Sequence, residues 1–301
     1  METRMGSVRT ADLDIAFEES GTAGDPAIIL LHGFPYDPRA YDAVVPRLVA
    51  GRNRVVVPYL RGYGATRFLR PDTLRSGQQA ALGQDLAELL DALGIERAGL
   101  VGYDWGGRAA CVVSALYPAR VRFLVSIGGY NIQDIAAAAT PADPEQERRL
   151  WYQYYFGTER GRVGLEQNRR EFCRLLWRLW SPTWAFTEET YAETARSFET
   201  PDFVAVVIHS YRHRYGIVAG DPRFEATERR LAEHPAITVP TLVLHGADDG
   251  VTPAATTRSE AGRFTGRYAS ELVRGVGHNL PQEAPERLAD AVLQLGAESP
   301  A

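Results

Sequence analysis

The feature that most restricts the fold of this chain is an alternation of short apolar runs with helical periods. The runs are Ala27–Leu31, Asn53–Pro58, Gly99–Tyr103 and Val121–Ile127, and a strand-like alternation at Leu13, Ile15 and Phe17 precedes them. Continuous apolar runs are typical of strands that are covered on both faces. Between them lie an amphipathic helix with Leu82, Leu86, Leu89, Leu90 and Leu93, and a second helix over Gly107–Tyr117. This order predicts an α/β fold with a parallel sheet and helices on both faces.

The alternation stops between Gln133 and Pro235. This stretch shows no strand pattern, but helical periods occur at Glu145–Phe156, Leu165–Trp180 and Asp202–Tyr211. Strand patterns return at Thr238–Leu244 and Tyr268–Val273, and a final helix carries Leu288, Ala291, Val292 and Leu295. We therefore expect a core made of residues 1–132 and 236–301, with a helical cap of residues 133–235 inserted into it.

Composition excludes several classes of protein. The 301 residues are 45% hydrophobic and 24% charged, which is an ordinary globular mixture. A net charge of -5 offers no attraction for nucleic-acid phosphates, and Cys111 and Cys173 are too few for a disulfide framework or a metal site. The longest apolar run, Ala27–Leu31, is too short to span a bilayer, and no basic-apolar leader opens the chain. We expect a cytoplasmic protein, a monomer or homodimer, without metal, membrane or nucleic-acid partners.

Four short segments follow predicted strands, at the edge where an open parallel sheet carries its active site. They are His32–Pro35, Gly102–Gly107, Gly246–Pro253 and Gly275–Asn279. Each segment alone is a weak signal, because glycine is common in turns and a single histidine is more often structural. Four such segments, each after a strand, favour a catalytic site.

The second segment, Gly102-Tyr103-Asp104-Trp105-Gly106-Gly107, has the form of a nucleophile elbow, whose sharp turn requires small neighbours. The residue at the nucleophile position is Asp104, where many such elbows have serine. An aspartate side chain has a reference pKa near ~3.9 and is ionised at pH 7. Its attack on an acyl carbon would give an unstable anhydride, whereas attack on a saturated carbon gives an ester that water can cleave. Displacement at an sp³ carbon is the predicted reaction.

The other segments provide groups for cleavage of that ester. His278 can deprotonate the water, and Asp249 can hold the imidazole in the required tautomer. Asp248 beside it is a second candidate for this role. The backbone N–H groups of Phe34 and Trp105 are the expected oxyanion hole. The order nucleophile, acid, histidine along the chain is that of the α/β-hydrolase fold.

The chain resembles the α/β-hydrolase epoxide hydrolases, the soluble type with an aspartate nucleophile. Family motifs match at His32–Pro35, Arg61–Gly64, Gly102–Gly107, Gly246–Asp249 and Gly277-His278. The resemblance covers nearly the whole chain, cap included. It implies a mostly parallel eight-stranded sheet and hydrolysis of a small-molecule epoxide to a vicinal diol, without a cofactor, through an aspartyl ester.

The same resemblance implies two cap tyrosines that activate the epoxide oxygen. Tyr152, in the run Tyr152–Phe156, and Tyr211, before Arg212, occupy the matching places. Phenols with a reference pKa near ~10 stay protonated at neutral pH and can donate to the opening ring. Tyr154 and Tyr155 remain competitors for the first position. Phe34, Trp105, Tyr152 and Tyr211 are the expected substrate contacts.

One departure from the family pattern is Tyr103, where family members usually have histidine before the nucleophile. That side chain points away from the nucleophile, so we expect either a changed substrate wall or changed contacts around the catalytic residues, and an intact reaction.

Two other functions compete with this interpretation. A dehalogenase on the same fold would use the same aspartyl ester, but haloalkane dehalogenases typically have asparagine where Phe34 stands. Haloacetate dehalogenases share an arginine at the position of Arg108 and carry a second one where this chain has Trp105. A non-catalytic ligand-binding protein of the same fold would have no need of Asp104, Asp249 and His278 together.

Overall fold

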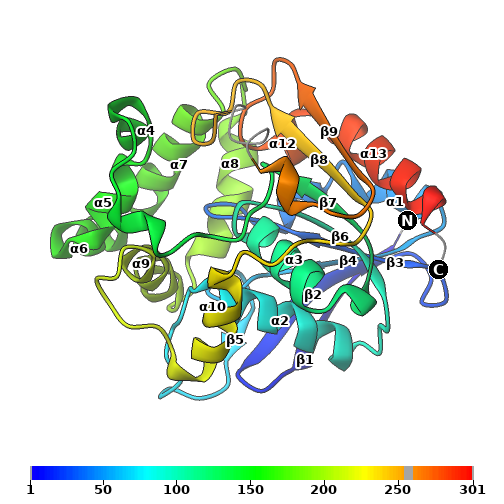
Figure 1. Ribbon diagram of the computed structural model, residues 1–301, viewed down its shortest axis with the longest axis horizontal. Coiled ribbons are helices and arrows are strands. Elements are labelled where there is room, and N and C mark those ends of the chain that lie inside the picture. Colours follow the sequence, from blue (N-terminus) through cyan, green and yellow to red (C-terminus); the bar gives the residue numbers. More distant parts are fainter. Residues whose placement is uncertain (1, 254–259, 300–301) are drawn as a thin grey trace.

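The computed structural model, which describes residues 2–253 and 260–299, contains one mixed sheet. Its strands are β1 Thr3–Arg9, β2 Leu13–Ser20, β3 Ala27–Leu31, β4 Arg54–Pro58, β5 Arg67–Phe68, β6 Ala98–Tyr103, β7 Val121–Ile127, β8 Thr241–Gly246 and β9 Tyr268–Val273. Eight strands run in the order β1-β2-β4-β3-β6-β7-β8-β9, and the two-residue β5 pairs with β2 (Figure 1). All pairs from β4 to β9 along this order are parallel. The predicted α/β fold with its mostly parallel sheet is confirmed.

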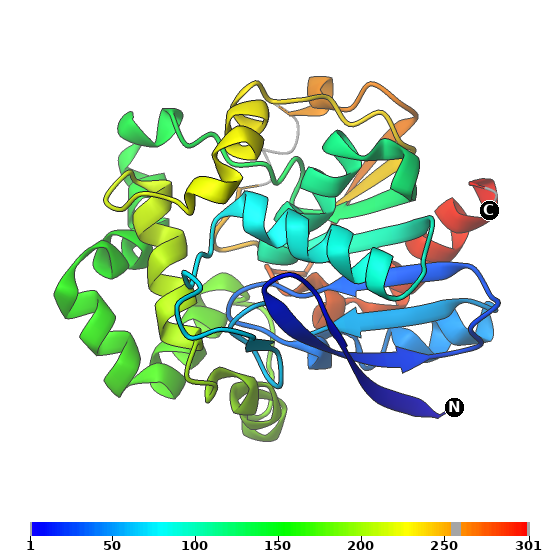
Figure 2. The ribbon, with the colours of Figure 1, turned by 90° about the horizontal axis from the view of Figure 1, so that it is seen from below.

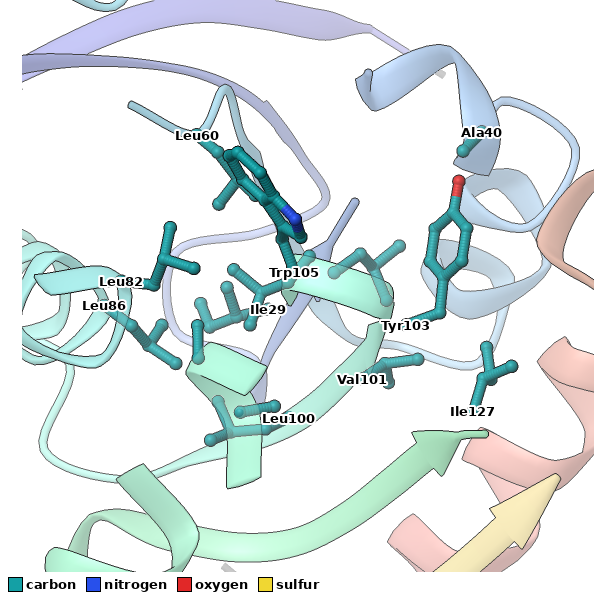
Figure 3. Close-up of a cluster of buried hydrophobic side chains, with 14 of the residues drawn as sticks. Ile29, Ala40, Leu60, Leu82, Leu86, Leu100, Val101, Tyr103, Trp105 and Ile127 are labelled. Atoms are coloured by element: carbon teal, nitrogen blue, oxygen red, sulfur yellow. The ribbon is translucent and has the colours of Figure 1, made fainter. Parts of the chain in front are cut away.

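Helices cover both faces of the sheet. Helices α2 (Gln79–Ala92) and α3 (Asp104–Leu116) pack on each other, and α3 also contacts β3, β6 and β7. On the other face, α1 (Val45–Ala50) packs on α13 (Pro285–Glu298), which contacts β7 and β8. In Figure 3, Leu82 and Leu86 of α2 lie beside Ile29 and Leu100 of the central strands. The apolar runs of the sequence thus form the interior strands of the sheet.

A long helical segment separates β7 from β8. Its helices are α4 Pro144–Arg149, α5 Trp151–Gly157, α6 Glu159–Gln167, α7 Arg169–Trp180, α8 Glu188–Ala195, α9 Phe203–Arg214 and α10 Glu225–Ala232. Helices α4 to α9 gather at the end of the molecule that lies away from both termini (Figures 1 and 2). We propose that residues 133–235 act as the cap. None of the helices in the described part of the chain has the length and apolar content that a bilayer crossing requires.

Some predicted boundaries are wrong. The helical period over Glu145–Phe156 is divided into α4 and α5 at Leu150, and α7 begins only at Arg169. Strand β8 begins at Thr241, three residues later than the pattern indicated, because Pro240 has no N–H to donate to a neighbouring strand.

A buried ion pair ties the loop after β4 to α2. The guanidinium of Arg61 is 2% exposed and binds both carboxylate oxygens of Asp85, at 2.6 and 2.7 Å. It also donates to the carbonyl of Ser76 at 2.8 Å. Arg61 of the Arg61–Gly64 motif thus has a structural role, because it anchors the loop after β4 to α2.

We predict that Asp85→Asn destabilises the protein by about 3 kcal/mol, because it leaves a buried guanidinium without its counter-charge. The matched control is Asp290→Asn, which breaks the exposed pair with Arg47 and costs at most about 1 kcal/mol. Urea unfolding followed by circular dichroism measures both. Equal small losses for the two variants would contradict the anchoring role of Arg61.

Candidate active site

The turn between β6 and α3 places Asp104 at the carboxyl end of the sheet. Asp104 has a φ of 49°, a left-handed conformation that is uncommon for a residue with a side chain. A Cβ at Gly106 would lie 2.1 Å from the carbonyl oxygen of Leu31, and one at Gly102 would lie 2.5 Å from that of Gly106. Only glycine therefore fits on both sides of this turn, as the elbow pattern predicts.

One predicted oxyanion donor bonds the Asp104 carboxylate, and the second belongs to the next residue of the chain. Its Oδ1 accepts a hydrogen bond of 2.7 Å from the N–H of Phe34. A Cβ at Gly33 would lie 2.5 Å from the Cβ of Asp104, so glycine at this position permits the close approach. Trp105 is the second residue of α3, and N–H groups in a first helical turn have no acceptor within the helix. The two predicted oxyanion donors thus lie in the two segments that meet at Asp104.

His278 and Asp249 come from two other loops and meet at the same place. The Nδ1 of His278 lies 2.9 Å from Asp249 Oδ2, and Asp249 Oδ1 accepts from the N–H groups of Val251 and Thr252 at 2.7 and 2.9 Å. The Nε2 of His278 lies 4.0 Å from Asp104 Oδ2. With Nδ1–H donating to the carboxylate, Nε2 is left as the basic nitrogen that faces Asp104. Asp249, and not Asp248, is the partner of the histidine.

Charges around the pair shift both pKa values. Burial by itself would lower the pKa of His278, but the Asp249 carboxylate, with help from Asp104, raises it above its ordinary value. Burial would raise the pKa of Asp249, but His278 and the N–H groups of Thr252 and Val251 hold it below its ordinary range. Each partner therefore stabilises the charged form of the other.

A cavity of about 380 Å³ opens beside these residues. Its lining combines residues of the core loops with residues of the helical segment, and includes Asp104, Asp249, His278 and Tyr152. Tyr154 is 39% exposed and packs on Tyr215, and Tyr155 stacks on Phe172. Of the three tyrosines that competed for the first cap position, Tyr152 is the one that lines the cavity.

Tyr211, Phe34 and Trp105 form an aromatic cluster next to this cavity and are not among its lining residues. The ring of Tyr211 lies 5.4 Å from that of Tyr152 and 5.6 Å from that of Phe34, and Trp105 stacks on Phe34 at 5.7 Å. Among the described residues the buried hydroxyl of Tyr211 has no hydrogen-bond partner. Burial and the nearby Asp104 raise the pKa of both phenols, Tyr152 and Tyr211, so both remain protonated donors at neutral pH.

Tyr103 and Trp105, on either side of Asp104, point in different directions (Figure 3). The Tyr103 ring points toward Ala40, and its hydroxyl donates to Asn279 Oδ1 at 3.2 Å. Asn279 follows His278 directly. The residue that departs from the family pattern therefore supports the histidine loop.

Two supporting residues were not predicted from the sequence. Glu283 accepts hydrogen bonds from the N–H groups of Gly277 and Asn279, at 2.7 and 3.1 Å, and so holds the backbone on both sides of His278. Gln153 donates to the hydroxyl of Tyr152 at 2.8 Å. Gln153 stands within the Tyr152–Phe156 run, whereas no local pattern distinguishes Glu283 from other helical glutamates.

Candidate metal ligands are sparse in the part of the chain that the structure describes. No three His, Cys, Asp or Glu side chains there gather as a metal-binding group. Cys111 and Cys173 are both buried and free, and neither lines the cavity at Asp104.

Comparison with known proteins identifies the fold family of this chain. Residues 26–285 match the family described as the alpha/beta hydrolase fold. The chain belongs to the α/β-hydrolase fold family. This confirms the fold and the hydrolase family that the motifs indicated.

Several relatives of this α/β-hydrolase are named epoxide hydrolases. Epoxide hydrolase A of Mycobacterium tuberculosis is 27% identical over 96% of this chain and 95% of its own. The structure of a Klebsiella pneumoniae protein, provisionally named an epoxide hydrolase, is 44% identical with a TM-score of 0.95 and covers 97% of each chain. The AB hydrolase superfamily protein YfhM of Bacillus subtilis is 26% identical over 74% of this chain and 78% of its own.

We predict that Asp249→Asn lowers the pKa of His278, because the carboxylate that stabilises the imidazolium is removed while burial remains. The matched control, Asp248→Asn, changes a neighbouring carboxylate that makes no bond to the imidazole ring in the described structure. It should leave the pKa of His278 unchanged. NMR titration of the imidazole C–H signals measures the pKa in each variant. A fall of the same size in both variants would contradict the assignment of Asp249.

Proposed function

We propose that this protein is an epoxide hydrolase that opens its substrate through a covalent ester on Asp104. The observation that supports this most strongly is the arrangement of three groups: a carboxylate oxygen, a basic imidazole nitrogen and a buried phenol. Asp104 Oδ2 faces His278 Nε2 at 4.0 Å, and neither that nitrogen nor the Tyr211 hydroxyl has a hydrogen-bond partner among the described residues. An epoxide and a water molecule together provide partners for these groups.

In the first step the free oxygen of Asp104, Oδ2, attacks an epoxide carbon, and the carbon–oxygen bond of the ring breaks. Oδ1 is the oxygen that the Phe34 N–H holds, so it becomes the ester carbonyl oxygen. The ring oxygen leaves as an alkoxide and needs a donor. Tyr152, which lines the cavity, and Tyr211 behind it are the proposed donors, and a fully buried donor of this kind contributes a rate factor of about 10² to 10⁴.

In the second step His278 takes a proton from water, and the hydroxide adds to the carbonyl carbon of the ester. The developing negative charge on Oδ1 is stabilised by the N–H groups of Phe34 and Trp105. Collapse of this intermediate breaks the bond between Cγ of Asp104 and the ester oxygen, which leaves with the substrate carbon. The imidazolium of His278 returns its proton to that leaving oxygen, so the vicinal diol is released and Asp104 is again a carboxylate, now with one oxygen from water. Asp249 stabilises the imidazolium that forms on His278.

A product assay tests the proposal against the dehalogenase alternative. The panel contains terminal, aryl and internal epoxides together with fluoroacetate and chloroacetate, and Asp104→Asn serves as the inactive control. We expect diol from at least one epoxide and no halide release. Halide release with inert epoxides would overturn the proposal in favour of a dehalogenase.

We predict that Tyr211→Phe lowers kcat for ring opening by about 10²-fold, because the leaving oxygen loses a donor. The matched control is Tyr154→Phe, which removes the hydroxyl of a tyrosine that packs outside the cavity. Single-turnover kinetics separates ring opening from ester cleavage. An equal rate in Tyr211→Phe and Tyr154→Phe would show that Tyr211 is not a donor to the substrate.

A further inference from the structure

Arg108 differs from the other buried arginines in having no polar partner. Arg61 binds Asp85, and Arg122 donates to the carbonyls of Ser299 and Gly296. Arg108 is 7% exposed, yet in the described part of the chain it makes no hydrogen bond and no ion pair. Its guanidinium carbon lies 5.8 Å from the ring of Trp105. A buried cation without a directly bonded counter-charge is costly, so a functional explanation is required.

Arg214 presents a second cation to the same cavity. It is the last residue of α9, is half-buried, and also has neither hydrogen bond nor ion pair within the described ranges. Both arginines line the cavity of about 380 Å³ that contains Asp104 and Tyr152. Burial lowers the pKa of Arg108, the Asp104 carboxylate opposes this shift, and the nearby Arg214 adds to the lowering, so the two cations act on each other across the cavity.

None of the acidic residues of this cavity forms an ion pair with either arginine in the described structure. Asp134 pairs with His234 at 3.1 Å and accepts from the N–H of Ala137. Glu260 accepts from the N–H of Tyr130 at 3.0 Å. Asp249 is bound to His278, and Asp104 is the proposed nucleophile. One cavity is thus lined by two guanidinium groups that form no ion pair with any carboxylate in the described structure, although Asp104 stabilises the charge of Arg108 from a distance.

The spacing along the helices relates both arginines to the reacting groups. Arg108 follows Asp104 by four residues in α3, and Arg214 follows Tyr211 by three residues in α9. Residues three or four apart lie on one helix face, about one turn or ~5–6 Å apart along the axis. An anion bound by the two arginines would therefore lie about one helical turn from the epoxide. One small molecule can span that distance and carry both groups.

We propose that Arg108 and Arg214 bind a carboxylate of the substrate, which makes the substrate an epoxy acid. This inference rests on the proposed function and names its substrate class. Guanidinium groups bind carboxylates through two parallel N–H donors, and such charge-assisted bonds are strong in a site that excludes water. The two arginines select substrates that carry a carboxylate and orient them in the cavity, and they take no part in bond breaking.

A binding experiment tests the carboxylate site without any turnover. Isothermal titration compares 3-phenylpropanoate with 3-phenylpropanamide, and hexanoate with hexanamide, which differ in charge and little in shape. We expect each carboxylate to bind at least about tenfold more tightly than its amide, and this preference to disappear in Arg108→Gln and Arg214→Gln. Arg162→Gln is the matched control, since Arg162 is an exposed helical arginine paired with Glu159 and Glu166, and it should retain the preference. Equal binding of acid and amide, or no detectable binding of the acid, would overturn the inference.

A kinetic experiment then distinguishes this inference from the proposed function. Glycidate and 3-phenylglycidate are each compared with their primary amides, and diol is the product measured. We expect kcat/KM to be at least about tenfold higher for the acids, with a ratio close to one in either arginine variant. Diol from the amides but not the acids would overturn the inference and leave the epoxide hydrolase proposal intact. Carboxylate binding without diol from any epoxide would overturn the proposed function and leave the anion site in place.

Discussion

The backbone turn between β6 and α3 holds Asp104 at positive φ, and the position of every other site residue is defined relative to it. The turn is possible because Gly102 and Gly106 leave room for the chain to pass within contact distance of β3. The register of the sheet pairs Gly102 with Leu31, which brings the Phe34 N–H to the Asp104 carboxylate. A single tight turn thus assembles the nucleophile and its first backbone donor.

The remaining chemistry comes from segments far apart in the sequence. The loop after β8 carries Asp249 and the loop after β9 carries His278, while Tyr152 and Tyr211 come from the helices between β7 and β8. Burial affects these groups in two ways. It keeps the phenols protonated, and it strengthens the interaction between Asp249 and His278 because little water screens their charges. The same exclusion of water makes two unpaired arginines expensive unless the substrate brings a negative charge.

Sequence patterns predicted the parts of this molecule in which local chemistry determines structure. Runs that are apolar throughout became β3, β4, β6 and β7, and glycine spacing located the turns that carry Asp104, Asp249 and His278. The pattern missed β1, because its mostly exposed residues show little apolar alternation. It also could not separate Tyr152 from Tyr154 and Tyr155, because that choice depends on how α5 packs. The isolation of Arg108 and Arg214 was equally out of reach, since a sequence does not show which arginines find a carboxylate in three dimensions.

The central claim is that Asp104, and not water, attacks the epoxide. A single turnover in H₂¹⁸O, with enzyme in excess over an epoxide that it hydrolyses, tests this directly. The account predicts that the first diol released contains no ¹⁸O, because its new oxygen comes from the carboxylate, and that the label enters the peptide containing Asp104. A first diol that carries ¹⁸O, with an unlabelled Asp104, would show direct attack by water and contradict the account.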